Sequence, residues 1–378
     1  MKVAVFGGSG FLGYDFVRFA LRHGGVEPIV YSGGGKSLAN VSRHDVDIRL
    51  YSADDPQAIA LDDDVDVVVN FAHPFERRGG ITGTEQIARF VRFVGQARRA
   101  NPRLRLIHLS SMSVFEPFGR NRRFEESDSL RPPRGDRYAQ EKVFAETALR
   151  SLPDADRWQL HLRPTVVYGP FCGAWTDRIF AAFKHGDVGY RDLSGRIQPI
   201  YGEDISRFIY DRLLDFTTGV YNLPGPEEMS WQTFLDTFRE IVGIGRLVQM
   251  SDASASRGGG DRRTSNSYKD DIRQLVQVVR REPSFVRMAG RIARRLPVAS
   301  DRVSMFLLGR DGARVASMSD VQTPNTAVFG TPYFAADRLV CETKCRRNYP
   351  TLKLSRVSDV KPVLEEYYRF RFSDDRFT

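Results

Sequence analysis

The chain has 378 residues, of which 41% are apolar, 27% charged and 11% aromatic, and its formal net charge is +9. This composition is too apolar for a disordered protein, and the apolar runs are too short to span a membrane. Three cysteines without histidines at zinc-ligand spacing exclude a disulfide scaffold, so we expect reduced thiols and no metal site. The first residues do not form a signal peptide, which predicts a cytoplasmic protein.

Short apolar runs alternate with helical patterns through the first half of the chain. We predict buried strands at 2–6, 28–31, 47–51, 65–71, 104–109 and 159–167. Apolar residues recur at helical spacing within 11–22, 84–100, 138–149 and 231–242. Strands that are apolar throughout and separated by helices favour a parallel sheet covered on both faces. The predicted fold is therefore α/β, a Rossmann-like doubly wound parallel sheet with a smaller mixed C-terminal substrate lobe.

The expected domain division follows this change of pattern. Residues 1–170 are assigned to a dinucleotide-binding domain, to which part of 195–225 returns, and residues 171–378 to a substrate-binding lobe. The substrate-binding lobe carries a basic insertion at about 245–330.

Positive charge is concentrated in that insertion. Between Gly243 and Arg310, fourteen basic residues stand against six acidic ones. Residues 285–296 have an apolar helix face beside four arginines, which suits peripheral contact with an anionic membrane or with an acidic carrier protein. A solvated face packed on its own domain explains the same pattern. We expect no nucleic-acid partner, because no aromatic-interleaved surface accompanies the charge.

A glycine-rich turn lies between the first strand and the first helix. Its spacing, Gly7, Gly10 and Gly13, suits a sharp turn, close approach of a pyrophosphate and tight helix–strand contact. The helix N-terminus then offers unpaired N–H groups to phosphates. This predicts a dinucleotide site that contains Gly7, Ser9, Gly10, Phe11, Leu12 and Gly13.

The end of the second strand bears on the choice of dinucleotide. A carboxylate there would bind the ribose 2′-hydroxyl of NAD and repel the 2′-phosphate of NADP. This chain has Ser32 and a glycine run instead, followed by Lys36 and Arg43, which could meet a 2′-phosphate. We therefore favour NADP over NAD, although a glycine-rich surface loop with solvated charges would look the same.

Three polar side chains suggest a reaction. Tyr138 and Lys142 are four residues apart and share one helix face, and an ammonium favours the phenolate form of a tyrosine. Ser111 follows the fifth strand, at the edge where a parallel sheet binds its ligands, and its hydroxyl can polarise a carbonyl. A tyrosine tuned in this way can act as an acid or base.

These residues, in this order, resemble the extended short-chain dehydrogenase/reductase family, of the NAD-dependent epimerase/dehydratase type. Further matches are Asn70-Phe71-Ala72, Glu146, Leu162-Arg163-Pro164, Asp204 and the late segment 341–347. The resemblance implies that Tyr138 is the acid/base, that Lys142 lowers its pKa and holds the nicotinamide ribose, and that Ser111 orients the substrate oxygen. It also implies that Ala72 and Pro164 contact the cofactor.

The chain departs from the family at two substrate positions. Met112-Ser113 stand where sugar-nucleotide 4,6-dehydratases carry an Asp-Glu pair, so dehydration is not expected. Ile197 stands where many members carry an arginine that binds the substrate diphosphate, with Arg196 adjacent. The resemblance leaves Ser113, His73 and Arg196 as candidate substrate residues.

Three functions stay open at this point. The first is an NAD(P)-dependent oxidoreductase or epimerase acting on a hydroxyl or ketone of a small-molecule substrate, a nucleotide-linked sugar. The second is an NADPH-dependent ketoreductase of a non-sugar metabolite, which a carrier protein could present. The third is a dinucleotide-sensing binding protein without catalysis. We expect a homodimer in each case.

Overall fold

The computed structural model describes residues 1–33, 38–51, 59–74, 82–115, 119, 121–132, 135–250, 327–329 and 333–372. Lys36, the predicted helix at 285–296 and most of the basic insertion lie outside these residues.

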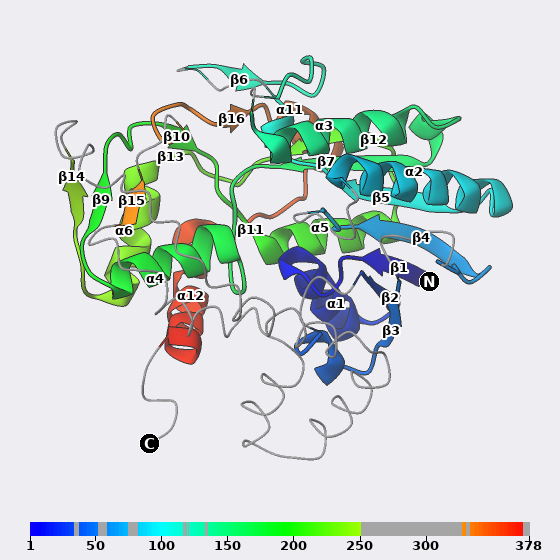
Figure 1. The fold of residues 1–378 in the computed structure, drawn as a ribbon, viewed down its shortest axis with the longest axis horizontal. Coiled ribbons are helices and arrows are strands. Elements are labelled where there is room, and N and C mark those ends of the chain that lie inside the picture. Colours follow the sequence, from blue (N-terminus) through cyan, green and yellow to red (C-terminus); the bar gives the residue numbers. More distant parts are fainter. Residues whose placement is uncertain are drawn as a thin grey trace, which may run out of the picture.

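A seven-stranded parallel sheet organises the described chain (Figure 1). From edge to edge its strands are β12 (Gly219–Leu223), β7 (Gln159–Pro164), β5 (Arg105–Leu109), β4 (Val65–Asn70), β1 (Lys2–Phe6), β2 (Glu27–Ser32) and β3 (Asp47–Leu50). Every neighbouring pair runs parallel. The order reverses at β1, and a reversal of this kind opens a crevice at the carboxyl ends of the strands. The predicted Rossmann-like α/β fold is confirmed.

Helices cover both faces of the sheet because its strands are apolar on both sides (Figure 1). Helices α1 (Phe11–His23) and α5 (Gly202–Leu214) pack over the face that carries Val3 and Val5. Helices α2 (Gly83–Ala100) and α3 (Arg137–Arg150) pack over the face that carries Ala4 and Phe6. The alternation of these four residues along β1 is the two-residue period of a strand.

A second lobe has its own core of aromatic side chains. Helices α4 (Arg178–Lys184), α6 (Trp231–Val242) and α12 (Val357–Phe372) surround it and contribute Phe180, Phe183, Trp231, Phe234, Phe238 and Phe372. Beside them, β9 (Val188–Tyr190) pairs in parallel with β14 (Leu247–Gln249) and β15 (Ala327–Phe329). Ser230 caps α6 by accepting a hydrogen bond from the Thr233 amide.

Short strand pairs connect distant parts of the chain. They are β6 (Arg123–Phe124) with β16 (Leu339–Val340), β8 (Val167–Tyr168) with β11 (Ile200–Tyr201), and β10 (Arg196–Ile197) with β13 (Met229–Ser230). Helix α11 (Thr343–Asn348) then packs against β12. Within the described ranges, no helix combines the length and hydropathy needed to cross a bilayer.

Most predicted strands end within one residue of the observed bounds, but one prediction merged two strands and one strand of the sheet was not predicted. The strand predicted at 159–167 ends at Pro164, and β8 begins separately at Val167. Between them, the Thr165 amide donates across to Leu223, and its hydroxyl donates to the Gln198 carbonyl, so the chain turns away from the sheet. Strand β12 had no clear pattern of its own because it is short and begins with a glycine at a φ of +111°.

Candidate active site

The glycine turn at the end of β1 leaves no room for side chains. Gly7 has a φ of +78°, and a Cβ added to it would lie 2.7 Å from the backbone nitrogen of Ala72. A Cβ on Gly13 would lie 2.2 Å from the Gly7 carbonyl oxygen. Gly10 donates from its amide to that same oxygen at 2.9 Å and stands just before α1. The structure therefore places the N-terminus of α1 at the carboxyl edge of the sheet, beside β1 and β4.

The predicted cofactor residues of the described chain lie in this turn or at the carboxyl ends of other strands of the sheet. Ser9 lies within it, and its hydroxyl is 3.4 Å from that of Ser32, the buried last residue of β2. Phe11 and Leu12 form the first turn of α1. Ala72 follows β4, and Pro164 ends β7, so both lie at the carboxyl edge of the sheet.

Ser111, Tyr138 and Lys142 come together at the end of β5. The Ser111 hydroxyl hydrogen-bonds the Tyr138 phenol. The Lys142 ammonium lies 5.8 Å from the centre of the Tyr138 ring and donates to the Leu109 carbonyl at 2.7 Å. Tyr138 is the second residue of α3, which Asp136 caps by accepting from the Ala139 amide. The loop after β5 and the first turns of α3 thus bring the three groups to one place.

The electrostatic state of these groups differs from the sequence expectation. Burial raises the pKa of Tyr138 to about 12, and the hydrogen bond with Ser111 only partly offsets it. Burial also lowers the pKa of Lys142 to about 8, although the nearby Glu146 carboxylate favours its charge. Lys142 was expected to lower the pKa of Tyr138. Burial of the phenol prevails here because the ammonium is directed at the backbone of β5.

A buried carboxylate supports Lys142 from one turn away. Glu146 is fully buried and accepts from the Ser110 hydroxyl at 2.7 Å and from Arg163 Nε at 3.1 Å. Burial works against its charge, but the bonds and charge of Arg163 prevail and hold the pKa of Glu146 below its usual range. The family match at Glu146 therefore corresponds to an ionised side chain beneath the reacting groups.

The three candidate substrate residues lie in different surroundings. His73 packs against Tyr138, with ring centres 4.9 Å apart. Ser113 follows Ser111 in a short 3-10 turn, Met112–Val114, and donates from its amide to the Ser111 hydroxyl. Arg196 donates to the Glu228 carboxylate at 2.6 Å and to Asp337 at 3.0 Å. His73 and Ser113 thus lie beside Ser111 and Tyr138. Arg196, in contrast, forms ion pairs with Glu228 and Asp337.

Two residues near Tyr138 were missed from the sequence. Tyr333 and Asp136 both act on the Tyr138 phenol and raise its pKa further. The Arg338 guanidinium lies 3.1 Å from the centre of the Tyr333 ring, and the negative charge of Asp136 favours the charged form of Arg338. No motif marks them. For Tyr333 and Arg338, the only sequence signal was an aromatic pair followed by an Asp-Arg pair, just before the segment 341–347 that resembles the family.

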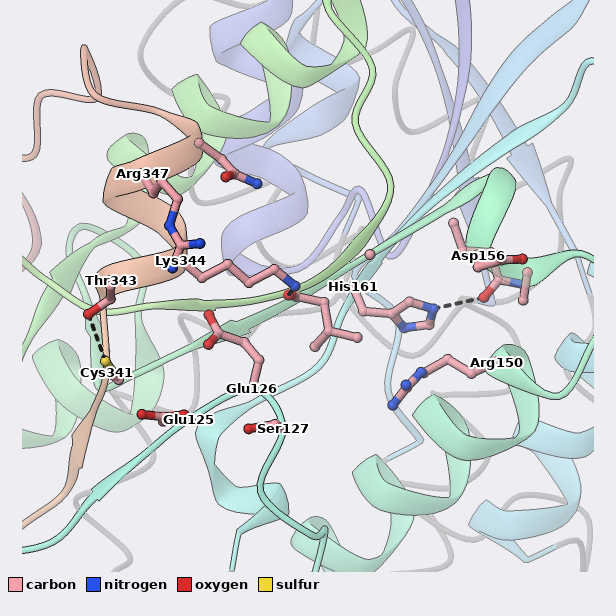
Figure 2. Close-up of a pocket in the computed structure, with 15 residues that line it drawn as sticks. Glu125, Glu126, Ser127, Arg150, Asp156, His161, Cys341, Thr343, Lys344 and Arg347 are labelled. Carbon is pink, nitrogen blue, oxygen red and sulfur yellow. Dashed lines mark hydrogen bonds between the residues drawn. The ribbon is translucent and has the colours of Figure 1, made fainter.

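A large cavity of the described chain lies elsewhere (Figure 2). It has a volume of about 810 Å³ and opens at the amino ends of β7 and β12, where His161, Arg150 and Lys344 face it. Ser111, Tyr138 and Lys142 do not line it. Because reacting groups define a catalytic site better than volume does, we place the candidate site at the opposite, carboxyl ends of the strands.

Comparisons with known proteins agree with this fold. A model of the NAD dependent epimerase/dehydratase family matches residues 3–219. The chain resembles the Bordetella bronchiseptica enzyme WbmH in complex with NAD+, with 12% identity and a TM-score of 0.63 over 97% of this chain and 98% of that one. It resembles dTDP-glucose 4,6-dehydratase of Bacillus anthracis str. Ames in complex with NAD, with 21% identity and a TM-score of 0.56 over 67% and 86%.

A third similar structure is the UDP-glucose 4-epimerase of Thermus thermophilus in complex with NAD, with 19% identity and a TM-score of 0.56 over 70% of this chain and 95% of that one. No curated protein sequence matches the chain. All three structures contain NAD, which lends no support to the preference for NADP. Identities this low establish only the fold, whereas the family model spans more than half of the sequence. The chain therefore belongs to the NAD dependent epimerase/dehydratase family, whose members are enzymes that bind NAD(P).

Proposed function

We propose that this protein is an NAD(P)-dependent oxidoreductase or epimerase that acts on a hydroxyl or ketone of a nucleotide-linked sugar. The observation that carries the proposal is the meeting of Ser111, Tyr138 and Lys142 at the end of β5. Separate stretches of chain bring a phenol, a hydroxyl and an ammonium to one place, which suits proton transfer at a carbonyl or alcohol oxygen.

The crevice beside this group fits a dinucleotide. Side chains at Gly7 and Gly13 would collide with backbone, so glycine at these positions lets the N-terminus of α1 lie close to the ends of β1 and β4. In this proposal the turn Gly7–Gly13 and the N-terminus of α1 hold the pyrophosphate. Ser32, Ala72 and Pro164 line the crevice, and Lys142 binds the nicotinamide ribose. NAD(P), when bound, supplies the hydride acceptor or donor.

In this proposal Tyr138 is the residue that donates the proton to the substrate oxygen. With its pKa at about 12, the phenol is protonated at neutral pH and can donate to a carbonyl oxygen. Ser111 holds that oxygen by a second hydrogen bond. In the reverse direction Tyr138 must be a phenolate in order to accept the alcohol proton, and a nearby ammonium such as that of Lys142 favours this form.

Two residues support epimerisation or reduction over dehydration. Met112 is almost fully buried, and Ser113 carries no charge, so neither can serve as the carboxylate acid or base that elimination requires. An epimerase would retain its cofactor, whereas a reductase would exchange it. The nucleotide that copurifies with the protein distinguishes them: retained NAD supports epimerisation, and exchangeable NADP supports reduction.

A second candidate is a ketoreductase of a non-sugar metabolite. It is supported by Ile197, which is fully buried, and by Arg196, whose guanidinium is engaged by Glu228 and Asp337. Thermal shifts with UDP, dTDP and GDP on NADPH-saturated protein separate the two. Stabilisation by a nucleoside diphosphate favours the sugar, and its absence favours the ketoreductase.

The decisive test of catalysis is Tyr138→Phe. We expect cofactor affinity to stay within about twofold and turnover to fall at least a hundredfold, because the ring remains while the exchangeable proton is lost. Undiminished turnover would refute the assignment. Tight NADPH binding without oxidation by any carbonyl compound in the wild-type protein would favour a dinucleotide sensor. The homodimer and the cytoplasmic location remain predictions.

A further inference from the structure

We propose that His73, held by the Glu141 carboxylate, is a positioning residue for Tyr138. The inference rests on the proposed function, because it assigns His73 a role through the acid/base tyrosine and not as a contact of the substrate.

Tyr138 needs support from outside its own helix. It is the second residue of α3, so no full turn of its own helix precedes it, and although the phenol end is enclosed, 37% of the surface of the whole residue is exposed. A tyrosine in this position would sample several rotamers. Proton transfer requires the phenol to stay within hydrogen-bond reach of the reacting oxygen, so a lateral contact that fixes the ring has a direct effect on rate.

His73 supplies that contact. Its ring meets the Tyr138 ring at an interplanar angle of 70° with centres 4.9 Å apart, the edge-to-face arrangement that aromatic pairs prefer. His73 follows directly on Ala72, whose amide lies against the Gly7 turn. The same contact therefore ties the acid/base residue to the place where we expect the cofactor.

The His73 ring is itself fixed. Its Nε2 lies 3.2 Å from Glu141 Oε2, and the two side chains are each only 6% exposed. Burial, reinforced by the charges of Lys142 and Arg137, lowers the pKa of His73 to about 2, so the imidazole is neutral. A neutral ring facing a carboxylate must carry its proton on Nε2, which defines both tautomer and orientation.

Glu141 is anchored independently of His73. Its Oε1 accepts from Arg137 Nε at 2.6 Å, and the carboxylate lies against the first residue of α2. A Cβ on Gly83 would lie 2.2 Å from that oxygen, so only glycine allows the approach. The N-terminus of α2 favours a negative charge at this place. The start of α2 thereby fixes Glu141, Glu141 fixes His73, and His73 fixes Tyr138.

The test separates ring contact from hydrogen bonding with two variants of the full chain. His73→Ala removes both, and His73→Phe keeps an aromatic edge without the proton on Nε2. His44→Ala is the matched control, because His44 also packs on a tyrosine, but that tyrosine is Tyr14 of α1. Thermal unfolding checks that all three variants are folded.

The first readout needs no substrate. With Cζ-labelled tyrosine, the Tyr138 signal is identified among the 14 tyrosines by its absence in Tyr138→Phe. We expect His73→Ala to move or broaden this signal selectively, and His73→Phe to restore much of its wild-type position. An unchanged Tyr138 signal in His73→Ala would overturn the inference whatever the enzyme's reaction is.

The second readout uses the substrate that the Tyr138→Phe test employs. We expect His73→Ala to lower kcat about tenfold and to leave KM and NAD(P) affinity within about twofold, as for loss of an interaction needed only in the transition state. An equal loss in NAD(P) affinity would make His73 a cofactor ligand and contradict a positioning role. Full activity of Tyr138→Phe would contradict the proposed function itself. In that case the Tyr138 signal of the wild type and of His73→Ala would still test the contact between the two rings.

Discussion

The Lys142 ammonium donates to the Leu109 carbonyl at 2.7 Å and so joins the middle of α3 to the last residue of β5. Lys142 is only 4% exposed, and burial lowers its pKa to about 8. Keeping this charge inside the protein at pH 7 costs about 3 kcal/mol relative to an exposed lysine. A site that retains a charge at such a cost uses it for binding or chemistry.

Lys142→Met should therefore be more stable than the wild type at neutral pH. We expect a gain of about 1–2 kcal/mol at pH 7, since the lost hydrogen bond offsets part of the relieved burial cost. The pKa of this base is lower in the folded state, so the penalty is present below about pH 8 and fades as pH rises toward 10.5. Urea unfolding at pH 7 and pH 10 measures the difference. A half-buried control on the surface, Lys361→Met, should show a much smaller gain.

Glu146→Gln should destabilise the protein. Arg163 is 1% exposed, and this substitution leaves its guanidinium buried without an opposite charge. We expect a loss of about 2–4 kcal/mol in the free energy of unfolding. Glu85→Gln, which removes an exposed partner of Arg89, should cost about 0.5 kcal/mol or less. Equal effects of the two substitutions would contradict the assigned charge on Glu146.

Asp15 provides a second test of pH dependence, far from Tyr138. It is 7% exposed, and burial raises its pKa from 3.8 to about 7. The folded state therefore holds a proton that the unfolded state releases, and this residue's contribution to stability declines as pH rises from about 4 to 7. Asp15→Asn should be about 2–4 kcal/mol more stable than the wild type at pH 8 and show no gain at pH 4, as urea unfolding at the two pH values would measure. Asp211→Asn, on the exposed side of α5, should behave like the wild type at both pH values.

Gly13→Ala should damage the cofactor turn. The new methyl group would meet the Gly7 carbonyl and the Gly8 Cα, both of which are backbone atoms that cannot rotate away. We expect NAD(P) affinity to fall more than tenfold and stability to fall by about 2–4 kcal/mol. Gly173→Ala, where no atom lies within 4 Å of the added Cβ, is the matched control. Isothermal titration calorimetry and urea unfolding check the two effects.

Local sequence patterns were sufficient to predict most strands of the parallel sheet and most of the helices that cover it. Strand β1 and helix α6 have the predicted bounds because a continuous apolar run and a clean helical period leave few alternatives. Strand β12 escaped prediction because its pairing with β7 is its main determinant. Pairing between distant segments leaves little trace in a short, glycine-initiated run.

The candidate site was predictable only where residues stand at fixed intervals. The Gly7–Gly13 turn and the Tyr138–Lys142 pair are local, so their spacing carries the geometry. Tyr333 and Arg338 depend on tertiary folding, which no local pattern encodes. The net direction of the Tyr138 pKa was not predictable either, because burial depends on surrounding segments, whereas spacing reveals only the nearby ammonium.

The position of Tyr333 has a consequence for how the protein becomes active during synthesis. Tyr333 and Arg338 leave the ribosome more than half a chain length after Tyr138, yet Tyr333 acts on the Tyr138 phenol and Arg338 packs on the Tyr333 ring. A nascent chain that has completed its glycine turn and its Tyr138–Lys142 helix still lacks this aromatic and cationic wall. Completion of the surroundings of Tyr138 therefore waits for a segment that is synthesised long after the helix that carries Tyr138.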